Sequence, residues 1–313
     1  TFKAPEKYSL EWYDETASLY NWLAGLEIDS TGRIYMADNN ATKIHIFAAD
    51  GAYIKSIGGE GRGPGEYLGF TDTQMIGNKL YVFDFMGFRT TRYSLDSMEV
   101  MEAGTVRPPV NQEDFKAIRT WRRSLPLLRS DGSYLAAFME HPPDSRVNSP
   151  SYNMDKDRPT KYYLMNKNSK IISEEIFETH KDYVRLTTKV DGQLESSFRP
   201  LPFLERSIIK ISDSNHIYTT WTDDFLIKVY GPEGNYKHAI YYPMPRKPIQ
   251  RDEILSIVGK DDYEREVIEN AELPPKWPVI RSMVVDDQER LWVSTIVDEK
   301  GVRQWWVLEH TGE

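Results

Sequence analysis

The sequence predicts an all-β fold in which a four-stranded antiparallel sheet recurs, as it does in a β-propeller. The first observation is a series of short apolar runs rich in Ile and Tyr, each closed by Gly, Asn or Asp. Such runs end before an amphipathic helix could complete its turns, so they indicate strands. They are Leu26–Ile28, Ile34–Ala37, Ile44–Phe47 and Tyr53–Ile57. Four strands joined by tight turns form one meander, whose open edges and small apolar face require further sheets to pack against it.

The second observation is that one strand of this unit recurs along the chain. Each copy is a turn followed by an apolar strand, and the first apolar residues are at 34, 80, 134, 217 and 291. The copies are Gly32–Asp38, Asn78–Asp84, Gly132–Phe138, Asn215–Trp221 and Glu289–Thr295. The first two intervals, 46 and 54 residues, fit one propeller blade of ~40–50 residues. The later intervals, 83 and 74 residues, need either a long insertion or a degenerate blade.

A resemblance to a known family follows from three segments. Asp29–Asp38, Lys43–Phe47 and Ile57–Tyr67 resemble an NHL-type repeat, and more closely the six-bladed propellers that many bacteria export to the cell envelope. The Gly-Pro-Gly-Glu stretch at 63–66 is the most specific part, and Asp286–Val293 resembles the penultimate blade of that group. The resemblance is strong over residues 26–84 and 279–308. It implies a six-bladed propeller and an exported protein, but no reaction, because most such proteins have no assigned activity.

The chain is expected to form a single propeller domain over residues 1–313. Five blades can be counted, and the resemblance implies a sixth. The counted blades lie near residues 26–58, 71–105, 125–179, 207–242 and 279–313. Residues 1–25, which include the apolar stretch Tyr8–Tyr13, are expected to contribute a strand that closes the ring. Gly58–Gly65 has no phosphate-loop or dinucleotide pattern, so we expect a connector that needs unusual backbone angles.

Three further stretches lie between these strands. Residues 139–160 form a polar, Pro-rich loop. Asp191-Gly192 is a strong signal for a hairpin, and its flanks Tyr183–Val190 and Gln193–Phe198 form either a small extra hairpin or part of a degenerate blade. Residues 250–272 contain a helical pattern with an Asp at each start, which predicts a helical insertion.

Composition limits the partners. The chain has 313 residues, 40% of them hydrophobic and 12% aromatic, enough for a substantial core. A net charge of −9 leaves no basic surface for nucleic acid. There is no cysteine, so disulfides, thiolate metal sites and cysteine nucleophiles are excluded. No apolar run reaches the ~18–20 residues of a membrane span. Because the sequence starts at Thr1 with no leader, we expect either that a signal segment has been removed or that the sequence begins late in the natural chain, and a lipid anchor on a removed segment is left open.

Motifs for catalysis are lacking. The six histidines are scattered without zinc-ligand spacing, and no Gly-x-Ser-x-Gly elbow occurs. The acidic pairs Asp223-Asp224, Asp261-Asp262 and Asp286-Asp287 fall in turns, where Asp is favoured for backbone reasons. We therefore expect no cofactor and no catalytic residue, with calcium held by turn carboxylates as an alternative.

Loop aromatics and cations supply the candidate ligand-binding residues. Arg119, Trp121 and Arg122 stand out, because guanidinium groups beside an indole in an acidic protein can bind a carboxylate or a sugar acid. A solvated connector whose Trp packs between blades is the simpler interpretation. The full candidate set is Trp22, Arg62, Arg89, Arg119, Trp121, Arg122, His141, Trp221, Trp277 and Arg281. These residue types suit glycan or peptide binding, and they equally suit blade packing.

The function expected from these observations is non-catalytic. The protein is predicted to be a binding or scaffold propeller at the bacterial cell envelope, in the periplasm, at the outer membrane or secreted. It would engage a protein, peptide or glycan through loops on one face. One alternative is a metal-dependent enzyme of the lactonase or lyase type with its site in the central channel. The other alternative is an accessory subunit of a larger envelope complex.

Overall fold

The structure is a computed structural model. It describes residues 23–84, 86–87, 89–105, 122–123, 126–139, 159–179, 186–190, 193–197, 203–258, 265–266, 268–269, 273–296 and 304–309. The chain divides into two compact units, Thr1–Pro108 and Pro109–Glu313, which are described separately below. The prediction of a single domain therefore stays a prediction.

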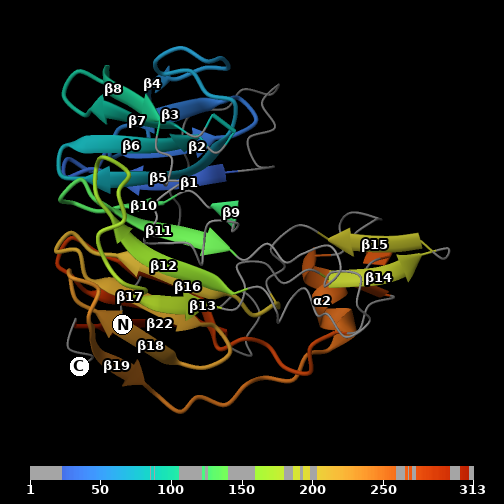
Figure 1. Ribbon diagram of the computed structural model, residues 1–313. Coiled ribbons are helices and arrows are strands. Elements are labelled where there is room, and N and C mark those ends of the chain that lie inside the picture. Colours follow the sequence, from blue (N-terminus) through green and yellow to red (C-terminus); the bar gives the residue numbers. More distant parts are fainter. Residues whose placement is uncertain are drawn as a thin grey trace. The chain divides into compact units, whose positions relative to one another are not determined.

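The first unit consists of two four-stranded antiparallel sheets (Figure 1). The first sheet has the order β1 (Leu23–Ile28), β2 (Ile34–Asp38), β3 (Lys43–Phe47) and β4 (Tyr53–Ile57). The second has the order β5 (Phe70–Ile76), β6 (Lys79–Asp84), β7 (Arg89–Ser94) and β8 (Val100–Thr105). Each strand pairs with its neighbour in sequence, which is the arrangement of a propeller blade.

Alternating side chains join these two sheets. Ile44 and Ile46 of β3 and Leu80 and Val82 of β6 are fully buried in one shared cluster. Residues two apart in a strand lie on the same sheet face, so this spacing gives each sheet an apolar face toward the other. Each buried side chain of this size stabilises the fold by about 1.5–3 kcal/mol relative to exposure.

The second unit contains three sheets of blade type. One sheet has β10 (Leu127–Leu128), β11 (Tyr134–Met139), β12 (Thr160–Met165) and β13 (Phe177–Thr179), with β9 (Arg122–Arg123) also paired to β11. The next has β16 (Ser207–Ile211), β17 (Ile217–Trp221), β18 (Leu226–Tyr230) and β19 (Tyr236–Tyr241). The last has β20 (Ile280–Val285), β21 (Leu291–Thr295) and β22 (Gln304–Leu308).

The middle sheet of this unit is packed on both faces. Ile217 and Tyr230 belong to a cluster with β11, β12 and β13. Tyr218 and Ile227, their neighbours on the opposite face, belong to a cluster with β20 and β21. Near-continuous burial of β17 follows from this double packing.

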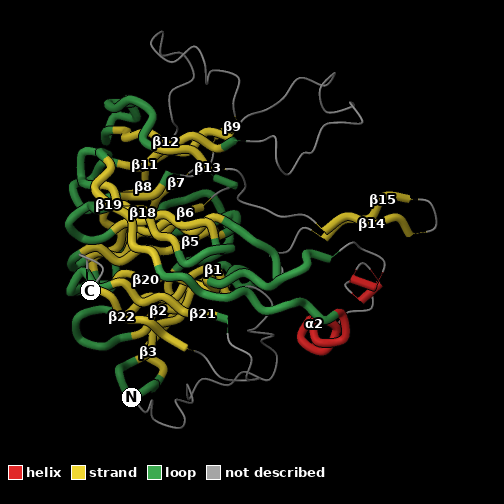
Figure 2. The backbone as a smooth tube through the Cα atoms, turned by 90° about the horizontal axis from the view of Figure 1, so that it is seen from below, coloured by secondary structure: helices red, strands yellow, loops and turns green. Residues whose placement is uncertain are grey.

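The remaining elements are insertions (Figure 2). The strands β14 (Leu186–Val190) and β15 (Gln193–Ser197) pair as a separate hairpin. The helix α2 (Arg251–Val258) buries Ile254 in a small cluster with Phe203 and Trp277. No helix in the described part of the chain is long and apolar enough to cross a membrane.

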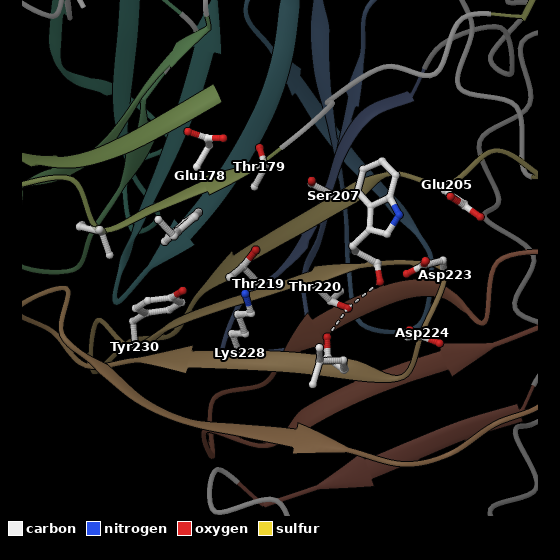
Figure 3. A pocket seen from close by; sticks show the side chains of 14 residues that line it. Glu178, Thr179, Glu205, Ser207, Thr219, Thr220, Asp223, Asp224, Lys228 and Tyr230 are labelled. Carbon is white, nitrogen blue, oxygen red and sulfur yellow. Dashed lines mark hydrogen bonds between the residues drawn. The ribbon is translucent and has the colours of Figure 1, made fainter. Parts of the chain in front are cut away.

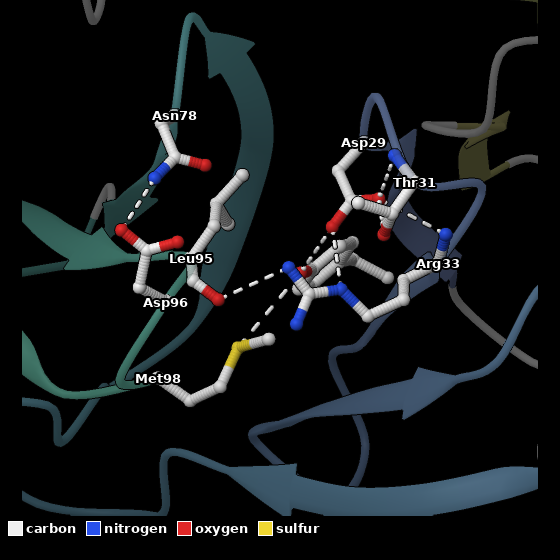
Figure 4. A network of polar contacts seen from close by, with 8 residues as sticks. Asp29, Thr31, Arg33, Asn78, Leu95, Asp96 and Met98 are labelled. Atoms are coloured by element: carbon white, nitrogen blue, oxygen red, sulfur yellow. Dashed lines mark hydrogen bonds and ion pairs between the residues drawn. The ribbon is translucent and has the colours of Figure 1, made fainter.

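The turn between the first two strands of a sheet is fixed by one carboxylate (Figure 4). Asp29 accepts hydrogen bonds from the backbone N–H groups of Thr31 and Arg33, at 2.9 and 3.0 Å. Its other oxygen accepts from the Arg33 guanidinium at 2.6 Å and the Tyr35 hydroxyl at 2.9 Å. Arg33 also donates to the Leu95 carbonyl of the next sheet, at 3.1 Å. The Asp29 carboxylate thus fixes the turn, and Arg33 links this turn to the second sheet.

The predicted fold class is confirmed. The fold is all-β and made of propeller blades, and five such sheets lie among the described residues. The helix α2 and the hairpin around Asp191-Gly192 occur where predicted. The connector at 58–65 has positive φ angles at Gly58 and Gly65, of 89° and 78°. The proposed ring-closing strand within residues 1–25 lies, up to residue 22, outside the described residues, and most of the loop at 139–160 does too.

Candidate functional site

A pocket of about 840 Å³ lies in the second unit, between the strand β13 and one face of the sheet β16–β19 (Figure 3). A pocket of this size can hold a small molecule or several side chains of a peptide. It is lined by Ile176, Phe177, Glu178, Thr179, Glu205, Ser207, Thr219, Thr220, Trp221, Asp223, Asp224, Leu226, Lys228 and Tyr230. Those residues come from three separate stretches of the chain.

Strand alternation explains why this face is open at one end. Ile217, Thr219 and Trp221 follow each other at a spacing of two residues, so they share one face of β17. Ile217 packs in the cluster with β11–β13, whereas Thr219 and Trp221 line the pocket. The adjacent strand β18 changes from apolar to polar in the same direction, because Ile217 pairs with Tyr230 and Thr219 pairs with Lys228. The face therefore changes from apolar packing to a polar pocket along the strands.

The charges around the pocket are mostly negative. Its lining contains four carboxylates, Glu178, Glu205, Asp223 and Asp224, and one cation, Lys228. Two of the carboxylates have partners next to the pocket. Glu205 pairs with Arg246, and Glu178 lies 3.8 Å from the ammonium group of Lys161.

The pocket also offers neutral hydrogen-bonding and aromatic groups. Thr179 is 8% exposed, and its Oγ1 has no hydrogen-bond partner within the described ranges. Trp221 is half-buried in the lining, and Ser207 pairs with it across β16 and β17. Such a mixture can orient a polar ligand by hydrogen bonds and hold its apolar part by stacking.

Of the ten candidate residues from the sequence, one lines this pocket. That residue is Trp221. Trp277 is instead buried at 4% exposure, with its ring edge-to-face against Phe203 at 6.3 Å. Arg281 is exposed on β20, and its carbonyl oxygen accepts a hydrogen bond from Arg206. The structure thus gives Trp277 a packing role.

The first unit contains two further candidates. Arg62 is exposed, and Arg89 donates to the carbonyl oxygens of Arg62 and Glu66. The guanidinium of Arg89 therefore holds the connector in place, which is a structural role. Trp22, Arg119, Trp121 and His141 lie outside the described residues, and only the backbone of Arg122 is described, in β9.

Sequence reasoning did not single out the polar residues that gather around Trp221. The sequence indicates turn residues at Asp223 and Asp224, with calcium binding as an alternative, and Glu205, Thr179 and Lys228 carry no motif. A usable signal is present in the sequence, since an acidic pair two residues after the Trp that ends a strand places carboxylates and an indole at one sheet end. Thr179 could not be found this way, because it comes from another sheet.

A buried histidine in the first sheet lies in a row of polar groups. His45 is 3% exposed, its Nδ1 lies 2.7 Å from Ser56 Oγ, and its Nε2 lies 3.6 Å from Asp38 Oδ2. The hydroxyl of Tyr53 also contacts Ser56, at 2.9 Å. The order of groups is that of a catalytic triad, but the 840 Å³ pocket does not border them. We interpret the row as a structural hydrogen-bond chain.

This histidine makes stability depend on pH. Burial lowers the pKa of His45 below its usual 6.5, against the opposing effect of Asp38. The folded state thus binds this proton less readily than the unfolded state, so protonation favours unfolding. We expect the free energy of unfolding to fall as the pH is lowered below about 6.5, by up to about 1.4 kcal/mol per pH unit.

Urea denaturation at pH 7.5, 6.5 and 5.5 measures this slope. His45→Gln is expected to reduce it, whereas His216→Gln, at a partly exposed position, is expected to keep it. Equal slopes in the wild type and His45→Gln would contradict the assignment.

Metal ligands do not gather in the described part of the chain. No group of three or more His, Asp or Glu side chains there is arranged to hold a metal ion.

Comparison with known proteins agrees with the fold. The model of the DUF5128 family, described as a 6-bladed beta-propeller, matches residues 26–118. From residue 26 onward, the match covers both sheets of the first unit, and it includes residues 26–84, one of the two stretches where the resemblance is strong. It supports a six-bladed propeller, whereas the narrower NHL-type assignment stays a prediction. No curated protein matches the sequence.

Among solved structures, the chain is similar to a Bacteroides fragilis protein provisionally described as exported, at 15% identity and a TM-score of 0.48, covering 96% of this chain and 72% of the other. It is also similar to virginiamycin B lyase from Staphylococcus aureus, at 10% identity and a TM-score of 0.39, covering 94% and 73%. Hydrazine synthase of Kuenenia stuttgartiensis gives 10% identity and a TM-score of 0.42, covering 93% and 72%. Likeness at this level carries no argument about activity.

Proposed function

We propose that this protein is a non-catalytic binding module that holds its ligand in the pocket between β13 and the sheet β16–β19. The single observation that supports it is the pocket of about 840 Å³ with its aromatic, hydroxyl and charged lining. Rigid strands on both sides position these groups, so little ordering is needed when a ligand binds.

We extend the proposal to the location of the protein, outside the cytoplasm. Two observations support it. The connector segment Ile57–Tyr67 resembles that of exported propellers, and the absence of cysteine is compatible with this location. An envelope location also agrees with a protein that binds peptides or glycans.

A pocket-filling substitution tests the binding site. Ser207→Trp places a bulky ring on β16 at the pocket wall, where Ser207 is half-buried. Purified wild-type protein is first screened against defined peptide and glycan arrays. For the ligands that bind, we expect Ser207→Trp to weaken binding by about tenfold or more, as lost contacts of about 1.4 kcal/mol would.

The control is Ser97→Trp, at an exposed turn of the first unit. It should bind as the wild type does. If the array ligands bound Ser207→Trp and Ser97→Trp equally well, the binding site would lie outside this pocket. A stoichiometric metal retained through dialysis, together with hydrolysis of a lactone, would contradict the non-catalytic proposal.

A further inference from the structure

Three carboxylates gather at one end of the pocket. Asp223 and Asp224 lie in the turn between β17 and β18, and Glu205 stands two residues before β16. Figure 3 shows these side chains on one side of the pocket and Glu178 and Tyr230 on the other side. Antiparallel pairing of β16 with β17 brings the two chain segments to the same end of the sheet.

This end carries negative charge without enough cations. Burial raises the pKa of Asp223, the carboxylates of Asp224 and Glu205 raise it further, and Arg246 opposes them. Arg246 forms its ion pair with Glu205. Neither Asp223 nor Asp224 forms an ion pair with any residue that the structure describes. A positive group placed here would relieve the repulsion between the carboxylates.

Two other groups in the same pocket also point to a ligand. The hydroxyl of Thr179 is more than nine-tenths buried in the lining, and its Oγ1 has no partner in the described chain. Buried hydroxyl groups are normally hydrogen-bonded, so this one fits a bound molecule that supplies the missing contact. Trp221 adds an indole ring next to the acidic turn, and cations bind favourably over indole rings.

We infer that the pocket takes a basic side chain of a peptide, with its ammonium or guanidinium group at the Glu205–Asp223–Asp224 end. The inference rests on the proposed function and names the ligand class. Lysine and arginine have a long apolar stem behind the charge, and Phe177, Leu226 and Tyr230 are among the residues that line the rest of the pocket, where Lys228 is the one cation in the described lining. A neutral sugar would leave the two unpaired carboxylates without a counter-charge.

Fluorine NMR of 5-fluorotryptophan-labelled full-length protein tests the inference. The Trp221→Phe variant identifies the resonance of Trp221 among the 8 tryptophans. The probes are N-acetyl-lysine methylamide and its uncharged counterpart N-acetyl-norleucine methylamide. We expect the lysine probe to shift the Trp221 resonance with an affinity roughly fivefold or more above that of the norleucine probe, the value of a partly exposed ion pair.

A matched pair of variants isolates the acidic end. Asp224→Asn is expected to weaken binding of the lysine probe roughly fivefold. Asp287→Asn removes one charge from an exposed turn outside the pocket and is expected to bind the probe as the wild type does.

The outcomes separate this inference from the proposed function. Equal binding of the two probes, or full binding by Asp224→Asn, would overturn the basic-ligand inference. The basic-ligand inference would also be overturned if an array ligand whose binding is lost in Ser207→Trp proved to be neutral or acidic. The proposed function would still stand in that case. If neither probe shifts Trp221 and Ser207→Trp changes no array ligand, the proposed function itself fails.

Discussion

Asp29→Ala is expected to lower the free energy of unfolding of the first unit by about 3–4 kcal/mol, because the buried Tyr35 hydroxyl and the donors of Thr31 and Arg33 lose their shared acceptor at once. The carboxylate accepts hydrogen bonds from Thr31, Arg33 and Tyr35, and its side chain is 2% exposed. Burial alone would raise the pKa of Asp29, but these hydrogen bonds lower it to about 2. The lowered pKa means that the ionised carboxylate stabilises the folded state.

The pH dependence gives a second measurement of the same effect. A folded pKa below the usual 3.8 contributes stability above that pH, and the contribution is lost as the pH falls toward about 2. Urea denaturation at pH 7 and pH 3 should therefore show a smaller difference between wild type and Asp29→Ala at the lower pH.

The matched control is Asp286→Ala, which removes the carboxylate from the same kind of turn in the last sheet. Asp286 accepts from Gln288, Arg290 and Trp292, but its side chain is 19% exposed. Water can replace part of these contacts, so we expect a loss of about 1–2 kcal/mol. Equal losses in the two variants would show that burial does not set the cost.

Ile227→Ala is expected to lower the free energy of unfolding by about 3 kcal/mol, within the range for truncating a buried Ile. Ile227 is fully buried in the cluster that joins β16–β19 to β20–β22, with Tyr218, Met283 and Val293 among its members. Strands packed on both faces cannot collapse easily around a missing side chain, so a cavity remains. Ile208→Ala, at a half-buried position beside the same cluster, should cost about 1 kcal/mol.

The two variants together test the predicted single domain. Asp29 lies in the unit Thr1–Pro108 and Ile227 in the unit Pro109–Glu313. One cooperative domain would show a single transition whose midpoint both substitutions lower. Two transitions, each sensitive to one substitution only, would rule out a single cooperative domain.

Most of the fold could be predicted because its determinants are local. Strand length, alternation and turn chemistry can all be read within stretches such as 29–47. Asp191-Gly192 marks its hairpin for the same reason, since the turn residues alone favour tight reversal. Three strands predicted in the first sheet therefore lie within one residue of the observed ones, namely Ile34–Ala37, Ile44–Phe47 and Tyr53–Ile57.

The candidate site was harder to predict, because its residues have no common motif. Trp221 and Trp277 are both aromatic residues of predicted loops or strand ends, yet one lines the pocket and the other is buried beside α2. Nothing within a few residues of either distinguishes them. Arg89 is of a residue type that often binds ligands, but its guanidinium group donates hydrogen bonds to the carbonyl oxygens of Arg62 and Glu66 in and beside the connector.

The sequence by itself determined the repeated strand-and-turn unit, since its backbone angles and apolar alternation depend on near neighbours in the chain. Only the tertiary structure decided where a pocket opens. Packing of β13 against the sheet β16–β19 brings Thr179 into the lining of the same pocket as Trp221 and Asp223. That packing depends on which sheet faces are covered. The sequence of a strand specifies which of its faces are apolar. It does not specify how far the neighbouring sheet extends over those faces.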